Sequence, residues 1–385
     1  MRTIILLLAM LSILSKIDAK GQNLIYAKDI PTEKLRIIPE TTQGGTVSEL
    51  LTDLEYIPLK GNKNQLLNDV YEMDCTADRI GILTWKGIFH LYDIEGNLLK
   101  IIDNVIGQKQ EKEKWALLFH NIQFNKLGFE LSHGYIKARY DINGNFIDTT
   151  SNRNNKWDNA TQIGTKKWTY YSPGLNDPKI KTIDALKLGD SVIVKYEKLD
   201  SVLISYGVHQ PLSPNINNQA YASFDYTTKL FELDSSGISK VYQFVFPLKN
   251  TVNLDEVRKV KDYTSYMHYY NAHREEIRTL DKVANYKNYL IMELKKSDSF
   301  WIALNLSNKR IIGLTNILPD KSSDYLKFMS GDFLRSNGEY LFSFLSPQDI
   351  RIAISKSKEE FHPVSERLKA LEKSNNPVFV RFKLK

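Results

Sequence analysis

The sequence predicts an all-β protein built as a six-bladed β-propeller, and three observations carry this prediction. Aromatic residues make up 11% of the 385 residues, and their side chains favour the pleated, half-buried surface of a sheet. Short β-prone runs joined by tight turns recur along most of the chain. Most successive hairpins follow one another at roughly 40 to 50 residues, which is the length of one propeller blade.

The first blade is predicted from residues 69 to 102, where four β-prone runs form a meander. These runs are Asp69–Asp74, Arg79–Thr84, Ile88–Tyr92 and Leu98–Ile102. Asp93, Glu95 and Asn97 alternate between the last two runs like the start of a calcium loop. The glycine of this stretch, Gly96, comes too early for such a loop, and Asn104 stands where its glutamate belongs. The pattern therefore predicts a hairpin turn.

The second blade repeats this arrangement. Its runs are Leu117–Asn125, Leu127–Leu131, Tyr135–Tyr140 and Asn145–Thr149. Asn143 and Gly144 stand at its last turn, and Asn-Gly is a strong hairpin signal because both residues accept a positive φ. Gly96 and Gly144 lie 48 residues apart and show the register of the repeat.

Four further hairpins complete the predicted six. They are Ser191–Tyr196 with Ser201–Tyr206, Thr228–Leu233 with Ile238–Phe246, Phe300–Leu304 with Arg310–Leu314, and Glu339–Leu345 with Asp349–Ser355. Their turns centre near Lys198, Gly237, Asn308 and Pro347. The step from Gly237 to Asn308 is 71 residues, which is too long for one blade and indicates an insertion.

The insertion, Leu254–Lys282, has helical rather than alternating periodicity. At helical spacing its apolar and aromatic residues form one stripe, made of Tyr263, Tyr266, Met267, Tyr270, His273, Ile277 and Leu280. We therefore expect an amphipathic helix that lies on the propeller. A second, short helix is predicted at Pro363–Lys373, where Leu368 and Leu371 share a face.

The two ends of the chain are predicted to close the ring. Residues 20–46 are polar and serve as a lead-in segment, and residues 47–385 form a single propeller domain. The run Glu55–Leu59 is surplus to the first blade, so we expect it to pair with the final strand, Pro377–Leu384, in the last blade. Pro58 fits the rim of the sheet because proline cannot donate to a ladder.

Residues 1–19 have the order of a secretory signal. Arg2 precedes the apolar run Ile4–Leu14, and Ala19 is the small residue before the expected cut. That run is too short to cross a hydrocarbon layer of ~30 Å, so no membrane span is expected. The only cysteine, Cys75, does not follow the cut, so no lipid anchor is expected, and Cys75 is predicted to be buried. We expect a periplasmic or extracellular protein.

The charge of the chain indicates no nucleic-acid partner. The formal net charge is +7, but basic residues alternate with acidic ones, as in the stretch Lys109–Lys114. Nucleic-acid binding favours a concentrated basic stripe instead.

Three stretches together carry a family resemblance. They are Glu55–Leu59, the hairpin Ile88–Asp93 with Gly96 and Asn97, and Asn376–Phe379 near the end. With the signal-like start, they resemble the TolB-like six-bladed β-propeller proteins exported by bacteria, a largely uncharacterised group. The resemblance covers essentially the whole mature chain and implies the propeller fold, but it carries no catalytic residues. Many members of that group look like lipoproteins, and this sequence departs from them because it lacks the lipid-acceptor cysteine.

The sequence favours a binding or interaction module over an enzyme. It contains no GxSxG, P-loop, dinucleotide-binding or HExxH pattern, and we predict no cofactor and no metal site. The candidate ligand contacts are Tyr266, Tyr269, Tyr270, His273 and Arg274, whose rings and polar tips suit a saccharide or peptide at the mouth of the central channel. Alternatively, the same stripe packs the helix against the propeller.

A propeller enzyme is the second hypothesis, as a metal-assisted hydrolase or lyase acting on a saccharide or lactone. Such an enzyme is expected to gather carboxylates or histidines from different blades, with shifted pKa values. A binding module is expected to show an aromatic, mostly neutral depression. The expected partner is a small saccharide, a peptide or another protein.

Overall fold

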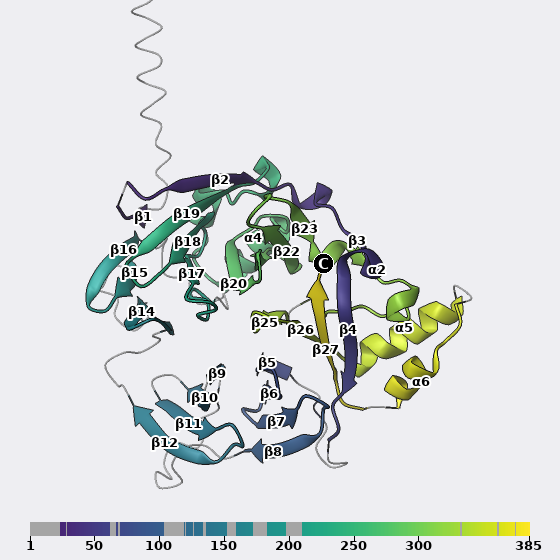
Figure 1. The fold of residues 1–385 in the computed structure, drawn as a ribbon. Coiled ribbons are helices and arrows are strands. Elements are labelled where there is room, and N and C mark those ends of the chain that lie inside the picture. Colours follow the sequence, from purple (N-terminus) through teal and green to yellow (C-terminus); the bar gives the residue numbers. More distant parts are fainter. Residues whose placement is uncertain are drawn as a thin grey trace, which may run out of the picture.

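The computed structural model describes residues 24–27, 29–61, 67, 70–103, 119, 121–125, 127–133, 136–151, 159–171, 183–197, 210–331, 333–359, 362–373 and 375–385. Within these ranges the chain forms six small sheets arranged in a ring (Figure 1). The predicted six-bladed β-propeller is therefore confirmed. The predicted signal at residues 1–19 lies outside the described residues.

The first two blades follow the prediction. Blade 1 consists of β5 (Val70–Cys75), β6 (Arg79–Thr84), β7 (Phe89–Asp93) and β8 (Leu98–Ile102). Blade 2 consists of β9 (Asn121–Asn125), β10 (Gly128–His133), β11 (Ile136–Asp141) and β12 (Phe146–Ser151). Cys75 is buried in blade 1, as expected, and burial raises the pKa of its thiol.

The turns Asp93–Asn97 in blade 1 and Asp141–Asn145 in blade 2 are stabilised by side-chain hydrogen bonds. Asp93 accepts hydrogen bonds from the backbone N–H and the side-chain amide of Asn97, at 2.7 and 2.8 Å. Asp141 does the same with Asn145, at 2.8 and 2.9 Å. The hydrogen bonds from Asn145 lower the pKa of Asp141. The carboxylates thus hold the turns closed, in agreement with the predicted hairpins.

Blade 3 contains a hairpin that was not predicted from the sequence. It consists of β13 (Asn159–Ile163), β14 (Lys166–Tyr171), β15 (Ile183–Leu188) and β16 (Ser191–Glu197), with β1 (Leu24–Ile25) at its edge. The strand at Ser191 therefore forms a hairpin with β15 and pairs with β1 at Lys195 and Tyr196. Gly189, at φ +58°, supplies the turn that the prediction overlooked. Ser201–Tyr206, the predicted partner of this strand, lies outside the described ranges.

Blade 4 contains the predicted fourth hairpin. Its strands are β17 (Ala220–Ser223), β18 (Lys229–Leu233) and β19 (Ile238–Val245), and β2 (Thr32–Arg36) runs parallel to β19 at the edge. The extended residues 210–213 take the innermost place, because Leu212 bridges Ala222 and Ser213 N donates to Tyr221 O at 2.8 Å. The lead-in segment thus covers the outer edges of blades 3 and 4 with β1 and β2.

Blade 5 contains the predicted fifth hairpin. Its strands are β20 (Thr279–Tyr286), β21 (Tyr289–Lys295), β22 (Phe300–Asn305) and β23 (Ile311–Gly313). After β23, the short strand β24 (Ile317–Leu318) pairs in parallel with β3 (Gly45–Thr46) from the N-terminal part of the chain. Short helical turns occupy α2 (Val47–Leu50), η1 (Pro39–Thr41), η3 (Leu248–Asn250), η4 (Leu314–Asn316) and η5 (Lys321–Ser323).

Blade 6 closes the ring with strands from both ends of the chain. It consists of β25 (Arg335–Ser336), β26 (Leu341–Leu345), β27 (Val378–Leu384) and β4 (Leu51–Pro58). Val378 stands opposite Pro58, and Leu384 stands opposite Leu51. This pairing confirms the predicted closure. Pro58 ends the outermost strand, where its missing N–H breaks no ladder.

The predicted sixth hairpin is wrong, because Asp349–Ser355 belongs to the helix α5 (Pro347–Glu359). Ser346 and Asp349 exchange hydrogen bonds at the start of this helix, in the manner of a capping box, and Pro347 follows the cap. The isoleucines at 350, 352 and 354 alternate like a strand, but only Ile350 and Ile354, four residues apart, are buried. The predicted C-terminal helix is confirmed as α6 (Glu366–Glu372), with Leu368 and Leu371 buried.

The predicted helical insertion is present but divided. It contains α3 (Leu254–Val257) and α4 (Tyr263–Ala272). Asp262 caps α4 by accepting a hydrogen bond from Ser265 N at 2.8 Å. The predicted end at Lys282 is too late, because Thr279 already begins β20 and Leu280 lies in that strand. Tyr263, expected on the packed stripe, is 56% exposed.

The inner strands all begin on one face of the ring, which we call the N-terminal face. Because neighbouring strands within a blade are antiparallel, the turn between the second and third strands of each blade lies on this face too. The helices α5 and α6 join β26 to β27 and share this face, and α4 does so because it leads into β20. No helix among the described residues is long and apolar enough to span a membrane.

Candidate functional site

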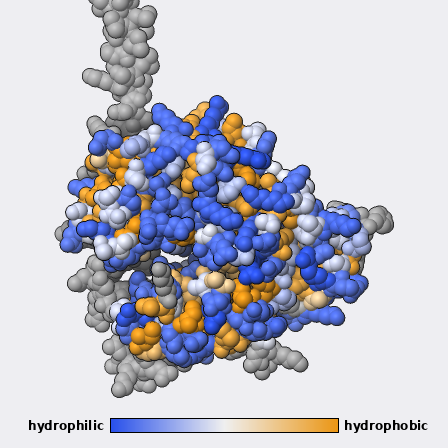
Figure 2. Space-filling view, viewed as in Figure 1, coloured by the Kyte–Doolittle hydropathy of each residue, from blue (hydrophilic) through white to orange (hydrophobic). Residues whose placement is uncertain are grey.

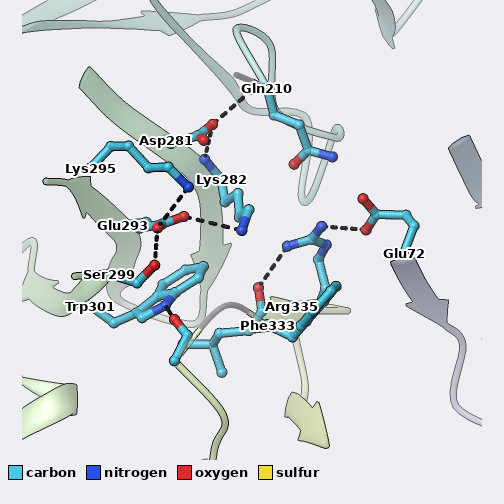
Figure 3. Close-up of polar contacts among 12 residues, drawn as sticks. Glu72, Gln210, Asp281, Lys282, Glu293, Lys295, Ser299, Trp301, Phe333 and Arg335 are labelled. Atoms are coloured by element: carbon cyan, nitrogen blue, oxygen red, sulfur yellow. Dashed lines mark hydrogen bonds and ion pairs between the residues drawn. The ribbon is translucent and has the colours of Figure 1, made fainter. Parts of the chain in front are cut away.

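Charged side chains from three blades meet around the centre of the ring. Glu72 comes from β5, Arg335 from β25, Asp281 and Lys282 from β20, and Glu293 from β21. We call these five residues the channel cluster. Figure 3 shows Lys282 and Arg335 pointing into the space between β20 and β5. The cluster lies toward the N-terminal face, since Glu72, Asp281 and Arg335 stand in the first half of their strands.

Arg335 and Glu72 form an ion pair that joins the last blade to the first. Their side chains are 13% and 16% exposed, so the pair is largely buried but reaches solvent. Burial alone would lower the pKa of Arg335, but Glu72, Asp74 and Asp281 outweigh it and raise that pKa. The guanidinium also donates to Leu334 O at 3.1 Å, which fixes its orientation.

Lys282 is aimed at the channel by a bulge in β20. The register of β20 against β21 shifts between Asp281 and Ala284, and Lys282 has a φ of +48°, which is uncommon for a residue with a side chain. Its Nζ lies 3.2 Å from Glu293 Oε2. The same ammonium lies 5.8 Å from the ring centre of Trp301 and 5.7 Å from that of Phe333. The bulge therefore places a cation among a carboxylate and two aromatic rings.

The two carboxylates of blade 5 are fully buried. Glu293 accepts a hydrogen bond from Ser299 Oγ at 2.5 Å and lies 3.3 Å from Lys295 Nζ, in addition to Lys282. Asp281 accepts a hydrogen bond from Gln210 N at 2.7 Å, which ties blade 5 to the innermost segment of blade 4. The charge of Glu293 is thus balanced by two lysines, and Asp281 is held by a backbone hydrogen bond.

Asp74 lies beside the channel cluster on β5. Its carboxylate accepts hydrogen bonds from Phe124 N of blade 2 at 2.7 Å and from Cys75 N at 2.9 Å. Burial raises the pKa of Asp74 to about 6 in spite of these bonds. Asp74 therefore gains or loses its proton near pH 6.

The predicted contacts on α4 are placed in two groups. Tyr269 is buried, its hydroxyl donates to the Glu276 carboxylate, and its ring stacks on His273 with centroids 4.4 Å apart. His273 Nδ1 lies 2.9 Å from Glu276 Oε1. The ring of Tyr266 lies 5.9 Å from that of Tyr270.

Tyr270 and its neighbours bind α4 to blade 5. The Tyr270 hydroxyl donates to Ser297 O at 3.3 Å, and the guanidinium of Arg278 lies 4.2 Å from its ring centre. Arg274 is exposed, and its carbonyl accepts a hydrogen bond from Ser297 N at 3.2 Å. Four of the five predicted side chains thus gather as packing contacts of the helix, and the Arg274 side chain lies outside them. These contacts correspond to the alternative in which the stripe packs the helix down.

Sequence reasoning missed the channel cluster. Glu72 and Arg335 are 263 residues apart, and no local pattern links them. One signal was available, because Glu293 interrupts the apolar run Tyr289–Leu294 inside a strand. A carboxylate at such a position needs a partner, and Lys282 supplies it.

The cluster is polar and charged, which differs from the aromatic, mostly neutral depression expected of a binding module. In the view of Figure 1, hydrophilic residues cover most of the surface, and hydrophobic residues form small patches scattered over several blades (Figure 2). Among the described residues, no three His, Cys, Asp or Glu side chains are arranged to hold a metal ion. Glu72, Lys282 and Arg335 are the cluster members that stay partly exposed, and together they present both hydrogen-bond acceptors and donors.

Comparisons with known proteins support the fold. No protein-family model and no curated protein matches the chain. A crystal structure of a Bacteroides fragilis NCTC 9343 protein, provisionally described as exported, aligns with 92% of this chain and 100% of its own length, at 13% identity and a TM-score of 0.65. The WD40 domain of Neurospora crassa Pan2 (8% identity, TM-score 0.37) covers 70% of this chain and 73% of its own. The RRP9 WD40 repeats (10% identity, TM-score 0.43) cover 89% and 99%. The first likeness shows that the chain shares its fold with a solved structure.

Proposed function

We propose that this protein is an exported β-propeller binding module, of the TolB-like kind, that holds a small polar ligand at the N-terminal end of its central channel. The observation that carries the proposal is the channel cluster, in which acidic and basic side chains from three blades converge. A saccharide or a peptide fits this chemistry, because hydroxyl and amide groups both donate and accept hydrogen bonds.

The geometry supports binding in a further way. The polar groups are held in place before any ligand arrives, since Arg335 is fixed by Glu72 and Lys282 by Glu293. Groups fixed in this manner lose little conformational freedom when a ligand binds. Export is supported by the signal-like order of residues 1–19 and by the description of the Bacteroides fragilis structure.

A thermal-shift screen of neutral oligosaccharides and short peptides tests this function, because a ligand that binds the native state raises the Tm. We expect one of these compounds to raise the Tm of the wild type. The shift should fall strongly in Arg335→Met. It should also fall in Gln210→Ala, which removes an amide that points into the channel in Figure 3 but keeps the bond from Gln210 N to Asp281.

Arg139→Met is the matched control for this screen. Arg139 also pairs with a carboxylate, that of Asp148, but the pair is exposed on the outer strands of blade 2. The ligand-induced shift should be unchanged in this variant. A shift that is equal in the wild type and in both channel variants would contradict the proposed site.

One observation favours a propeller enzyme as a second candidate. Glu72 and Asp74 from blade 1 and Asp281 from blade 5 lie around one channel, and burial raises the pKa of Asp74 to about 6. A carboxyl with such a pKa suits a general acid in a hydrolase or lyase acting on a saccharide or lactone. Product formation that stops in Asp74→Asn while ligand binding persists would support this candidate.

A further inference from the structure

Two aromatic side chains lie beside the channel cluster on the N-terminal face. Trp85 stands in the turn between β6 and β7 and is 65% exposed. Its ring meets that of Tyr71 with centroids 4.4 Å apart and an interplanar angle of 66°. Tyr71 belongs to β5 and directly precedes Glu72. We call Tyr71 and Trp85 the aromatic platform.

The local backbone holds this platform in place. The turn that carries Trp85 is closed by hydrogen bonds from Gly87 N to Thr84 O at 2.9 Å and from Thr84 N to Ile88 O at 3.0 Å. In β5, a register shift between Val70 and Glu72 leaves Tyr71 as the extra residue of a bulge. Tyr71 is partly buried against the core between blades 1 and 2. An anchored ring therefore supports an exposed one.

The platform is linked to the ion pair of Glu72 and Arg335 through the chain, because Tyr71 directly precedes Glu72 in β5. Burial raises the pKa of Tyr71, and the negative charge of Glu72 adds to this effect. On the N-terminal face, the exposed indole of Trp85 thus offers an apolar face, and the ion pair of Glu72 and Arg335 offers planar polar groups. A sugar ring presents the matching surfaces, because its C–H face packs on an aromatic ring and its hydroxyls hydrogen-bond to charged side chains.

The charge balance favours a neutral sugar over an anion. Among the described residues in and beside the cluster, the carboxylates of Glu72, Asp74, Asp281 and Glu293 have as charge partners the three cations Lys282, Lys295 and Arg335. An additional negative charge would meet repulsion from this set. Resting on the proposed function, we infer that the ligand is a neutral saccharide whose ring stacks on Trp85 and whose hydroxyls bind Glu72 and Arg335.

Phe146 provides a matched control for the platform. It is 58% exposed, and its ring meets that of Tyr140 edge-on with centroids 5.7 Å apart. Phe146 lies on β12, the outermost strand of blade 2, and so stands away from the channel. Phe146→Ala thus removes an exposed aromatic ring of similar packing without touching the inferred site.

The test is a calorimetric titration of the purified protein with neutral gluco-, manno-, galacto- and xylo-oligosaccharides, and with short peptides. We expect one oligosaccharide series to bind the wild type, with a Kd about tenfold higher in Trp85→Ala, as for the loss of one stacking contact. Trp85→Phe should restore part of the affinity, and Phe146→Ala should bind like the wild type.

Two outcomes would overturn the inference. One is an oligosaccharide that binds equally well to the wild type and to Trp85→Ala. The other is an absence of oligosaccharide binding. If peptides then bind in an Arg335-dependent manner, the proposed function stands and the saccharide inference fails, whereas binding of neither class overturns both.

Discussion

Arg335 and Glu72 illustrate how one buried ion pair connects stability with function, because the same two side chains join blades 6 and 1 and face the channel. We predict that Arg335→Met lowers the free energy of unfolding by about 3 kcal/mol, since it leaves Glu72 with an uncompensated, largely buried charge. Adding Glu72→Gln should recover part of this loss. Denaturant unfolding of the two single variants and the double variant measures the coupling, and additive losses would argue against the pair.

Asp74 is predicted to make stability depend on pH. Because burial raises its pKa from the usual value to about 6, the folded state holds this proton more tightly than the unfolded state does. The stability that the folded protein gains from binding this proton more tightly is therefore complete at low pH and is lost as the pH rises through about 6. We expect Asp74→Asn to gain roughly 2 to 3 kcal/mol relative to the wild type between pH 4 and pH 7.

The comparison with the variant is needed because His90 acts in the opposite direction. His90 is buried, and burial lowers its pKa to about 4, so its contribution is present at neutral pH and lost as the pH falls through that value. The two effects partly cancel in the wild type. Thermal unfolding of both proteins from pH 4 to pH 8 separates them, and a constant difference in stability across this range would show that Asp74 does not titrate as described.

At the scale of single elements, Asn376 couples the two ends of the chain. Asn376 lies just before β27, and Leu59 lies just beyond β4. The Asn376 side-chain amide accepts a hydrogen bond from Leu67 N at 2.9 Å and donates one to Leu59 O at 3.1 Å. Asn376→Ala would leave both buried backbone groups without these bonds, so we expect a loss of about 1 to 3 kcal/mol. Chemical unfolding should show this loss, whereas the exposed Asn143→Ala should change stability by less than about 0.5 kcal/mol.

The elements differ in how far the sequence could predict them. Blades 1 and 2 were predictable because Gly96 and Gly144 mark tight turns at a fixed spacing, and such turns are decided by local backbone preferences. Helix α5 was not predictable from periodicity, because its isoleucines alternate as they would in a strand. The hydrogen bonds between its capping residues Ser346 and Asp349 favour the helix instead. For α4, the helical character was predictable, but its ends depend on the cap at Asp262 and on the pairing of β20.

The channel cluster shows why the site could not be predicted from the sequence. A propeller site is assembled from single residues of different blades, so Glu72, Lys282 and Arg335 become neighbours only when the ring closes. Three of the candidate residues, Tyr266, Tyr270 and His273, lie on the stripe that the helical periodicity predicts. That periodicity predicts how a helix packs, and Tyr266 and Tyr270 do pack in this way, although the buried Tyr269 lies off the predicted stripe.

For the whole molecule, both the folding of the propeller and the assembly of the channel cluster depend on closure of the ring. The strand β27 pairs with β4 on one side and with β26 on the other. We predict that removal of residues 376–385 prevents cooperative folding, because blade 6 loses its third strand and exposes two edges. Calorimetry measures this directly. A truncated chain that melts cooperatively near the full-length Tm would refute the closure as a requirement.

The central claim is that the ligand binds where the inner strands of blades 1, 4, 5 and 6 begin. A crystal structure of the protein with the oligosaccharide or peptide that raises its Tm most tests this claim directly. The account predicts ligand atoms within about 3 Å of the Glu72 carboxylate and the Arg335 guanidinium. A ligand bound instead on the opposite face of the ring, or on the outer side of α4, would contradict it.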